Sequence, residues 1–337
     1  MHVGSDAVSG NGFRRICLIH VGAIGDFVLA LRLIAMLKAT WPRATLEVLG
    51  RPETASIAVG RAGVDGVASV ETLGLHTFFV EDTELDAKAK DYFAQFDLVV
   101  DMLGGPGSTF AANVGTCVDC VVSIESRLRS DWQGHVSEQW IEDLLAADVG
   151  VDPQHRPLPV LPFDQAERFE ARARLQKLTP TAGQPIVLLH PGAGGTTKCW
   201  PIESFQALAG ALHQDGVQAI FLVGPVELDV FGDPLVESLR AFAPVLHEVA
   251  LTEAAALVAG ADAYVGNDSG MTHLAAAVES STIALFGPTD PTAWRPLGST
   301  VRVLTGAADR KDPFTGLDVS TVHHVVLSCL EKPPISA

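Results

Sequence analysis

Short apolar runs that end in glycine, proline or polar residues alternate with helical stretches along most of this 337-residue chain. The first such run, RRICLIH, is followed by VGAIGD and then by FVLALRLIAMLKATW, which is apolar almost all round and ends at Pro42. Strands and helices that alternate at this spacing are typical of βαβ units, whose strands pair in parallel. The sequence therefore predicts an α/β fold.

Two proline-rich segments interrupt this alternation near the middle of the chain. DPQHRPLPVLPFD and TPTAGQP flank a charged helical stretch, and a second series of strands and helices begins with PIVLLHP. We expect two similar open-sheet domains, residues 1–165 and 166–317, followed by an amphipathic helix over about 318–337. One face of that helix carries the apolar residues Val322, Val325, Val326 and Cys329.

The composition argues against several classes of protein. A net charge of −17 disfavours nonspecific nucleic-acid binding and broad adhesion to an anionic membrane, because both depend on basic patches. No apolar run is long enough for a membrane span, and the first fifteen residues lack the apolar segment of a secretory signal. A cytoplasmic protein is expected, with at most peripheral membrane contact.

The cysteines indicate neither a disulfide framework nor a metal site. Their number, five, is odd, and only Cys117 and Cys120 are spaced as a C-x-x-C pair. No second cysteine or histidine pair completes a zinc site with them, so buried thiols are expected there and no metal.

The unusual loops of the chain all follow expected strands. Ligands of open parallel sheets bind beyond the carboxyl ends of the strands, and two facing sheets would form a cleft. A single loop of this composition is ordinary turn chemistry, whereas several on one edge favour a binding site. The loops are HVGAIGD (20–26), HPGAGGTTK (190–198), VGPVELD (223–229), GNDSGMTH (266–273) and FGPTDP (286–291).

The polar cluster GNDSG admits two interpretations of equal weight. Asp268 or Ser269 would cap a helix that starts near Met271. Alternatively, the free N–H groups and positive dipole at the start of that helix would bind a phosphate, with Gly270 allowing close approach and His273 reaching the same anion.

Three further side chains have both a structural and a functional interpretation. Lys198 is either solvated or placed to neutralise a leaving phosphate, and Glu227 is either a surface acid or a ligand of ribose hydroxyls. Asp26 either complements a helix dipole or acts as a general base, with His20 in the same loop.

Three well-known motifs are absent from these loops. The spacing before Lys198 is not that of a P-loop, and GAIGD is not the G-x-G-x-x-G dinucleotide fingerprint. GNDSG also differs from the G-x-S-x-G nucleophile elbow, which makes Ser269 a poor hydrolase nucleophile.

Together the motifs resemble glycosyltransferase family 9, the ADP-heptose:lipopolysaccharide heptosyltransferases. The resemblance runs from GAIGDFVLALRLIAMLKATWPRATLEVL through HPGAGGTTKCWPIESFQALAGAL to VGNDSGMTHLAAAVESSTIALFGPTDPTAWRP. It implies a GT-B fold, in which two Rossmann-like domains face each other across a cleft. The N-terminal domain would bind the acceptor and the C-terminal domain the nucleotide sugar, with the tail helix packing back on the first domain.

The resemblance also implies an inverting transfer that needs no metal and no cofactor besides the donor, with lipopolysaccharide core as an acceptor at the inner face of the inner membrane. By position, Asp26 resembles the general base and Lys198 the cation that stabilises the departing diphosphate. The donor site would comprise Gly194, Thr196, Thr197, Glu227, Asp268, Ser269, Gly270, Met271 and His273. One acceptor-side candidate is His20, at a position where members of the family often have Arg or Lys. The other is the pair Arg127 and Arg129, which either meets an anionic acceptor or is a solvated surface pair.

Four alternatives stay open from the sequence. The same fold would serve a transferase with another nucleotide-sugar donor or a small-molecule acceptor, a sugar-nucleotide epimerase, or a catalytically silent nucleotide-sugar-binding module. A nicotinamide dehydrogenase is the weakest of them, because the glycine fingerprint is missing.

Overall fold

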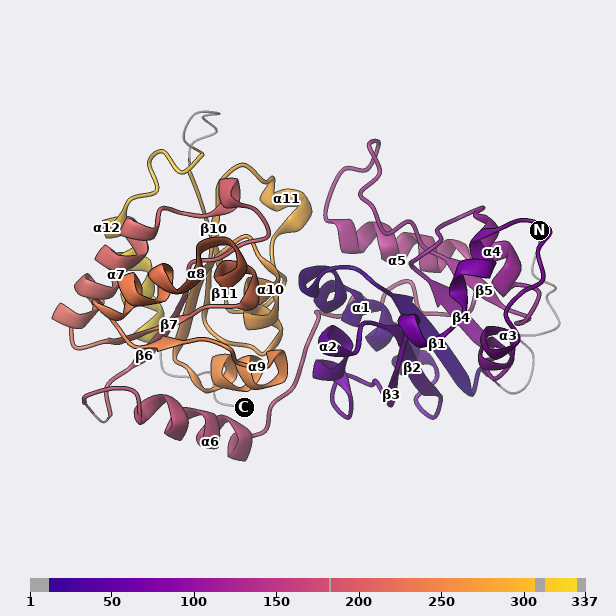
Figure 1. The fold of residues 1–337 in the computed structure, drawn as a ribbon, viewed down its shortest axis with the longest axis horizontal. Coiled ribbons are helices and arrows are strands. Elements are labelled where there is room, and N and C mark those ends of the chain that lie inside the picture. Colours follow the sequence, from indigo (N-terminus) through magenta and orange to yellow (C-terminus); the bar gives the residue numbers. More distant parts are fainter. Residues whose placement is uncertain (1–11, 182, 307–312, 332–337) are drawn as a thin grey trace. The chain divides into compact units, whose positions relative to one another are not determined.

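The structure is a computed structural model that describes residues 12–181, 183–306 and 313–331. Residues 1–11 and the end of the expected tail helix, residues 332–337, lie outside the described residues. The chain divides into two compact units, 1–159 and 160–337, which Figure 1 colours from indigo to magenta and from rose to yellow.

Unit 1 is built on a five-stranded parallel sheet with the strand order β3-β2-β1-β4-β5. The chain runs outward from β1 to β3 and then returns to the other side of β1, so the strand order reverses between β1 and β4. The strands are β1 (Arg15–His20), β2 (Thr45–Gly50), β3 (Gly66–Ser69), β4 (Leu98–Asp101) and β5 (Val121–Ser123).

Both faces of this sheet are buried, as expected when helices cover a parallel sheet on each side. Cys17 and Ile19 face a core shared with η3, α3 and α4, and the alternate residues Ile16 and Leu18 are fully buried as well. The expected apolar helix is α1, which packs against α5. The helices are α1 (Ile24–Thr40), α2 (Pro52–Ala55), η1 (Ser56–Ala58), η2 (Val70–Thr72), η3 (Leu75–Phe79), α3 (Ala87–Phe93), α4 (Thr109–Val114) and α5 (Val136–Ala146).

Unit 2 contains a six-stranded parallel sheet with the order β11-β10-β9-β6-β7-β8. Here the strand order reverses between β6 and β9. The strands are β6 (Ile186–His190), β7 (Gln218–Leu222), β8 (Val245–Leu246), β9 (Ala263–Asn267), β10 (Thr282–Phe286) and β11 (Val301–Thr305). The α/β fold class and the strand expected at PIVLLHP are confirmed, as are the strands expected to lead into the loops at 223–229, 266–273 and 286–291.

The main core of unit 2 lies between this sheet and α7, α8 and α12, with Trp200 and Phe205 among its fully buried side chains. Elsewhere in the unit, α9 packs against α6 and α10. Helix α8 is interrupted at Gly232, where φ is 64°. The helices are α6 (Gln165–Gln176), η4 (Thr196–Lys198), α7 (Ile202–Gln214), α8 (Pro225–Arg240), α9 (Leu251–Gly260), α10 (Gly270–Ala277), α11 (Pro291–Trp294) and α12 (Val319–Leu330).

The division between the units differs from the expected boundary after residue 165. It falls after Pro159, because Leu161 is fully buried and its N–H donates to the carbonyl of Ala277, 2.8 Å away in unit 2. The proline-rich segment therefore ends inside the second unit.

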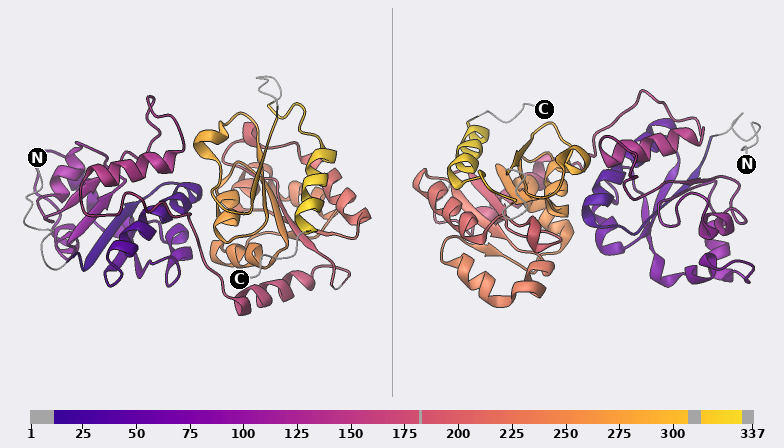
Figure 2. Two further views of the ribbon diagram at one scale, coloured as in Figure 1. Left: turned by 180° about the vertical axis from the view of Figure 1, so that it is seen from behind. Right: turned by 90° about the horizontal axis from the view of Figure 1, so that it is seen from above.

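The tail helix also differs from expectation. It is amphipathic as predicted, but α12 packs against α7 and β9, and Val322 and Val326 are part of the core of unit 2 (Figures 1 and 2). The expectation that this helix packs on the first domain is wrong, because its apolar face completes the core of the second.

A Val326→Ala substitution is expected to destabilise unit 2 by roughly 1–3 kcal/mol, because it leaves a cavity in a core that α12 closes. Thermal unfolding followed by calorimetry measures the loss. His324→Ala, an exposed change on the same helix, is the control and should leave the transition in place. Equal effects of the two substitutions would contradict the placement of α12.

Candidate active site

The loops that follow β6 and β9 lie next to each other at the carboxyl edge of the sheet in unit 2. His190 pairs with Gly266 in register, so residues 191–200 and 267–273 continue from adjacent strand ends. This is the point where the strand order reverses, and ligands of open α/β sheets bind at such points. The topology thus joins two of the loops that the sequence analysis singled out.

Lys198 and Asp268 form an ion pair at this edge, with Nζ of Lys198 2.7 Å from Oδ2 of Asp268. The lysine side chain is 39% exposed, whereas that of the aspartate is only 7% exposed. The cation therefore faces both an acid in the protein and the solvent, where an anionic group of a ligand would arrive. The sequence analysis identified Lys198 and Asp268 as separate candidates, and in the structure they contact each other.

The capping interpretation of GNDSG is wrong for both of the residues it named. Ser269 is the N-cap residue of α10 but makes no capping bond with its side chain, which instead lies 3.2 Å from Oγ1 of Thr272. Asp268 pairs with Lys198. Ser269, Gly270 and Met271 are half-buried at the start of α10, and His273 is buried one turn further on. This helix start thus keeps its positive dipole end without a side-chain cap.

Glu227 is a buried carboxylate and not a surface acid. Its side chain caps α8, since the N–H of Gly224 donates to Oε2 at 2.7 Å. A Cβ built on Gly192 would lie only 1.8 Å from Oε1, so glycine is required where the loop after β6 passes this carboxylate. Glu227 therefore lies beside the same loop as Lys198 and also stabilises its own helix.

The remaining donor-site candidates lie in the loop that carries Lys198. Thr196, Thr197 and Lys198 form the short helix η4, in which the N–H of Lys198 donates to Gly195. Gly194, Thr196 and Thr197 are exposed, so they are accessible to a ligand at this edge.

Unit 1 presents a comparable edge where β1 ends. Asp26 is half-buried in the first turn of α1, and its Oδ2 accepts a hydrogen bond of 3.3 Å from the N–H of Ala23. A Cβ built on Gly22 would lie 3.1 Å from this oxygen and 3.0 Å from Cε1 of His20. Gly22 thus allows the chain to pass between the aspartate and the imidazole, and His20 and Asp26 flank it.

Burial, together with the smaller effect of the nearby charge of Arg51, lowers the pKa of His20 to about 4. The imidazole is 5% exposed and packs against the ring of Phe27. His20 is therefore neutral at pH 7, and it does not supply the positive charge that Arg or Lys would supply there.

Arg127 and Arg129 lie in different surroundings in the structure. Arg129 forms an ion pair of 2.6 Å with Asp143 and lies over the ring of Trp132, so its charge is used within unit 1. Arg127 is exposed beyond the end of β5 and remains an acceptor-side candidate.

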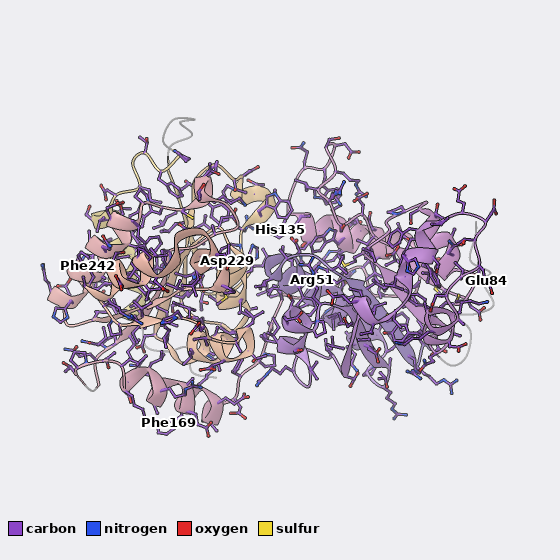
Figure 3. The ribbon with its side chains drawn as sticks, viewed as in Figure 1. Arg51, Glu84, His135, Phe169, Asp229 and Phe242 are labelled. Carbon is purple, nitrogen blue, oxygen red and sulfur yellow. The ribbon has the colours of Figure 1, made fainter. Side chains whose placement is uncertain are left out.

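Sequence reasoning missed two polar residues at the carboxyl edge of unit 1. Arg51, labelled in Figure 3, is exposed directly after β2, and Asp101 is the fully buried last residue of β4. Oδ1 of Asp101 accepts hydrogen bonds from the N–H groups of Leu103 and Gly104, while burial raises its pKa. The available signal was their position at the ends of apolar runs, Arg51 after ATLEVLG and Asp101 at the end of FDLVVD.

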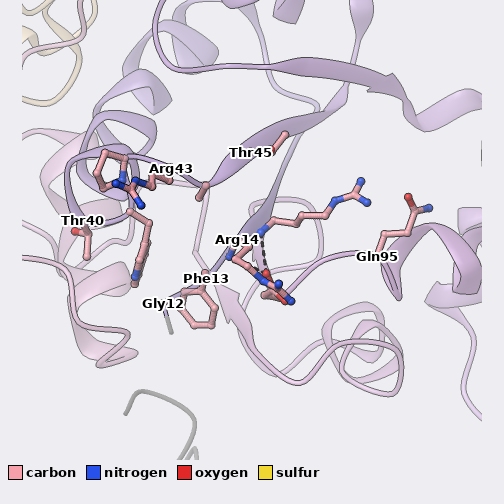
Figure 4. Close-up of a pocket in the computed structure, with 12 residues that line it drawn as sticks. Gly12, Phe13, Arg14, Thr40, Arg43, Thr45 and Gln95 are labelled. Atoms are coloured by element: carbon pink, nitrogen blue, oxygen red, sulfur yellow. Dashed lines mark hydrogen bonds between the residues drawn. The ribbon is translucent and has the colours of Figure 1, made fainter. Parts of the chain in front are cut away.

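An open pocket lies at the opposite edge of the same sheet (Figure 4). Its lining includes Arg14, Arg43 and Thr45, and the N–H groups of Arg14 and Arg15 donate to Asp97 there. Since these residues precede or begin strands, the pocket lies away from His20 and Asp26 and is separate from the candidate site.

In the part of the chain that the structure describes, two features are absent. No helix there is long and apolar enough to cross a membrane. No group of three or more histidine, cysteine or acidic residues there is arranged to hold a metal ion. Cys117 and Cys120 are free thiols.

The family model of glycosyltransferase family 9 (heptosyltransferase) matches residues 121–316, more than half of the chain. The chain belongs to glycosyltransferase family 9. It is 28% identical over 316 residues to lipooligosaccharide heptosyltransferase 2 of Haemophilus influenzae. This match covers 86% of this chain and 88% of that protein.

Solved structures confirm the fold of this family 9 enzyme as GT-B, with two Rossmann-like units. The ADP-heptose lipopolysaccharide heptosyltransferase II of Escherichia coli matches with a TM-score of 0.72 at 20% identity, over 94% of this chain and 98% of that chain. The family 9 glycosyltransferase of Veillonella parvula matches with a TM-score of 0.73 at 16% identity, over 98% of each chain.

The low pKa of the buried His20 predicts that the protein loses stability in acid. The unfolded chain takes up a proton on this histidine as the pH falls below 6.5, whereas the folded protein does so only near pH 4. The free energy of unfolding should therefore fall by up to about 3 kcal/mol between these values. Urea unfolding at several pH values, compared with His20→Gln, isolates this contribution; parallel pH profiles would contradict it.

Proposed function

We propose that this family 9 glycosyltransferase transfers heptose from ADP-heptose to a hydroxyl group of lipopolysaccharide core, with inversion at the anomeric carbon. The names of its relatives supply the sugar and the class of acceptor. The observation that carries the proposal is the ion pair between Lys198 and Asp268 at the point of strand-order reversal in unit 2.

In this proposal the donor binds at the carboxyl edge of unit 2. Lys198 and the start of α10 neutralise the diphosphate, and Gly270 lets it approach the backbone. Asp268 orients Lys198 and accepts hydrogen bonds from sugar hydroxyls, assisted by His273. Glu227 binds the ribose hydroxyls with the carboxylate that lies beside Gly192. Gly194, Thr196, Thr197, Ser269 and Met271 line the same donor site.

The transfer itself is a single displacement. Asp26 takes the proton of the acceptor hydroxyl, the acceptor oxygen forms a bond to the anomeric carbon, and the bond from that carbon to the diphosphate oxygen breaks. The electron pair leaves with ADP, whose added charge Lys198 stabilises. Neutral His20 would donate or accept a hydrogen bond beside Asp26 without competing for the proton.

The acceptor is proposed to meet unit 1 at the end of its sheet. Exposed Arg51 and Arg127 follow β2 and β5 and would contact phosphate groups of an anionic glycolipid. Arg129 is a weaker candidate, because its guanidinium is held within unit 1 by both Asp143 and the ring of Trp132. The enzyme would act on the cytoplasmic side of the inner membrane through peripheral contact.

The proposed transfer uses neither a metal ion nor a cofactor, because Lys198 and the helix dipole supply the positive charge that the departing diphosphate needs. It therefore predicts donor binding that a chelator leaves unchanged.

Calorimetric titration with ADP, UDP and GDP tests the donor site. We expect ADP to bind best, with or without EDTA, and Lys198→Ala to weaken ADP binding on the order of ten- to a hundredfold because a charge-assisted contact is lost. Lys177→Ala removes an exposed lysine of the same unit and should change nothing. Preference for UDP or GDP would assign another donor class, and binding of none would favour a silent module.

An Asp26→Asn substitution tests the base. Turnover with ADP-heptose and a lipopolysaccharide core acceptor should fall at least about a hundredfold, because proton removal is lost, while ADP affinity stays within about twofold. Asp91→Asn, a change of an exposed carboxylate in the same unit, is the control. Retained turnover in Asp26→Asn would remove Asp26 from this role.

A further inference from the structure

The loop that carries Lys198 has little packing to hold it. Residues 193–199 are half-buried or exposed, in contrast to the buried Pro191, Gly192 and Trp200 at its two ends. A lysine on such a loop would lose side-chain and backbone freedom on binding a diphosphate, which weakens binding. The interactions that fix the two ends therefore matter for the position of the cation.

A single side chain joins these two ends. Nδ2 of Asn267 donates to the carbonyl of Pro191 at 2.7 Å and lies 3.4 Å from that of Gly192, while Oδ1 accepts from the N–H of Trp200 at 2.9 Å. Asn267 is fully buried at the end of β9, so these bonds are shielded from water.

The anchor of Trp200 extends into the core. Its indole Nε1 donates to the carbonyl of Leu317 at 2.9 Å, and its ring packs edge-on against Phe205. The bond from Asn267 therefore ties the loop to a residue that is itself fixed, not to another loop residue.

Asn267 directly precedes Asp268, the partner of Lys198. Two consecutive residues at the end of β9 thus act on one loop, the first on the backbone at its ends and the second on the lysine side chain. An amide suits the first position, because it donates and accepts at once; a carboxylate would face the two carbonyl oxygens with no hydrogen to donate.

We propose that Asn267 is a positioning residue that closes the loop of residues 191–200 and so places Lys198 at the diphosphate of the donor. The proposal rests on the proposed function for the role of Lys198. The closure of the loop, however, is testable without any donor.

The first measurement is the labelling of Cys199 by a maleimide, located by mass spectrometry. Cys199 lies in the loop, and its thiol is half-buried against the carbonyl of Gly195 at 3.6 Å. In Asn267→Asp the rate of labelling should rise at least about tenfold, the equivalent of one lost buried hydrogen bond. Buried Cys17 serves as the internal reference for global unfolding.

Thr282→Val is the matched control. Thr282 is fully buried in the same sheet and donates to the carbonyl of Ser280 at 2.9 Å, so this variant also loses one buried hydrogen bond. It should change Cys199 labelling less than about twofold. Asn267→Ser, which keeps a hydroxyl donor, provides a milder variant if Asn267→Asp does not fold. Unchanged labelling in whichever variant folds would overturn the proposal.

The second measurement is a double-mutant cycle on ADP affinity. Asn267→Asp should weaken ADP binding about tenfold when Lys198 is present and less than about twofold in the Lys198→Ala background, because its effect passes through the lysine. Equal losses in both backgrounds would show that Asn267 does not act through Lys198. Failure of the wild-type protein to bind ADP would contradict the proposed function instead, and the labelling ratio alone would then decide whether Asn267 closes the loop.

Discussion

The parallel pairing of β6 with β9 is the constraint on which the candidate donor site depends. The paired residues Val187 on β6 and Ala263 on β9 are 76 residues apart in the sequence. The carboxyl ends of the two strands are nevertheless neighbours, because the strand order reverses between them. A cation that follows one strand then meets an acid that follows the other. The same reversal between β1 and β4 in unit 1 brings the loop of Asp26 beside the loop after Asp101. At each edge, polar residues that are far apart in the sequence therefore lie close together.

Much of the fold was predictable, because buried parallel strands are continuous apolar runs and their helices have clear ends. What was missed has physical reasons. β3 and β5 are only four and three residues long, too short for periodicity to mark them. Gly232 and Pro234 break the pattern of α8, so its start looked like a loop. The unit boundary and the partner of α12 depend on tertiary burial, of Leu161 and Val326 respectively, which amphipathicity alone does not specify.

The candidate site was predictable in its membership but not in its contacts. Lys198, Asp268 and Glu227 were identifiable because they follow strands, and the family resemblance gave them roles. That Lys198 pairs with Asp268 follows only from the pairing of β6 with β9, and that Glu227 caps α8 follows only from the start of that helix directly after Gly224. Arg129 shows the converse. Its position indicated a solvated cation, but its guanidinium is held within unit 1 by Asp143 on α5 and also by the ring of Trp132.

The ion pair between Lys198 and Asp268 adds little net stability, but it offsets the cost of burying Asp268. Exposed or half-exposed pairs are worth about 0–1 kcal/mol, and Lys198 is 39% exposed. Asp268, in contrast, is 7% exposed, and a carboxylate so buried is costly without a positive partner. The lysine therefore neutralises a buried acid while its own charge stays open to solvent. In a protein with a net charge of −17, the pair keeps this edge locally neutral instead of acidic.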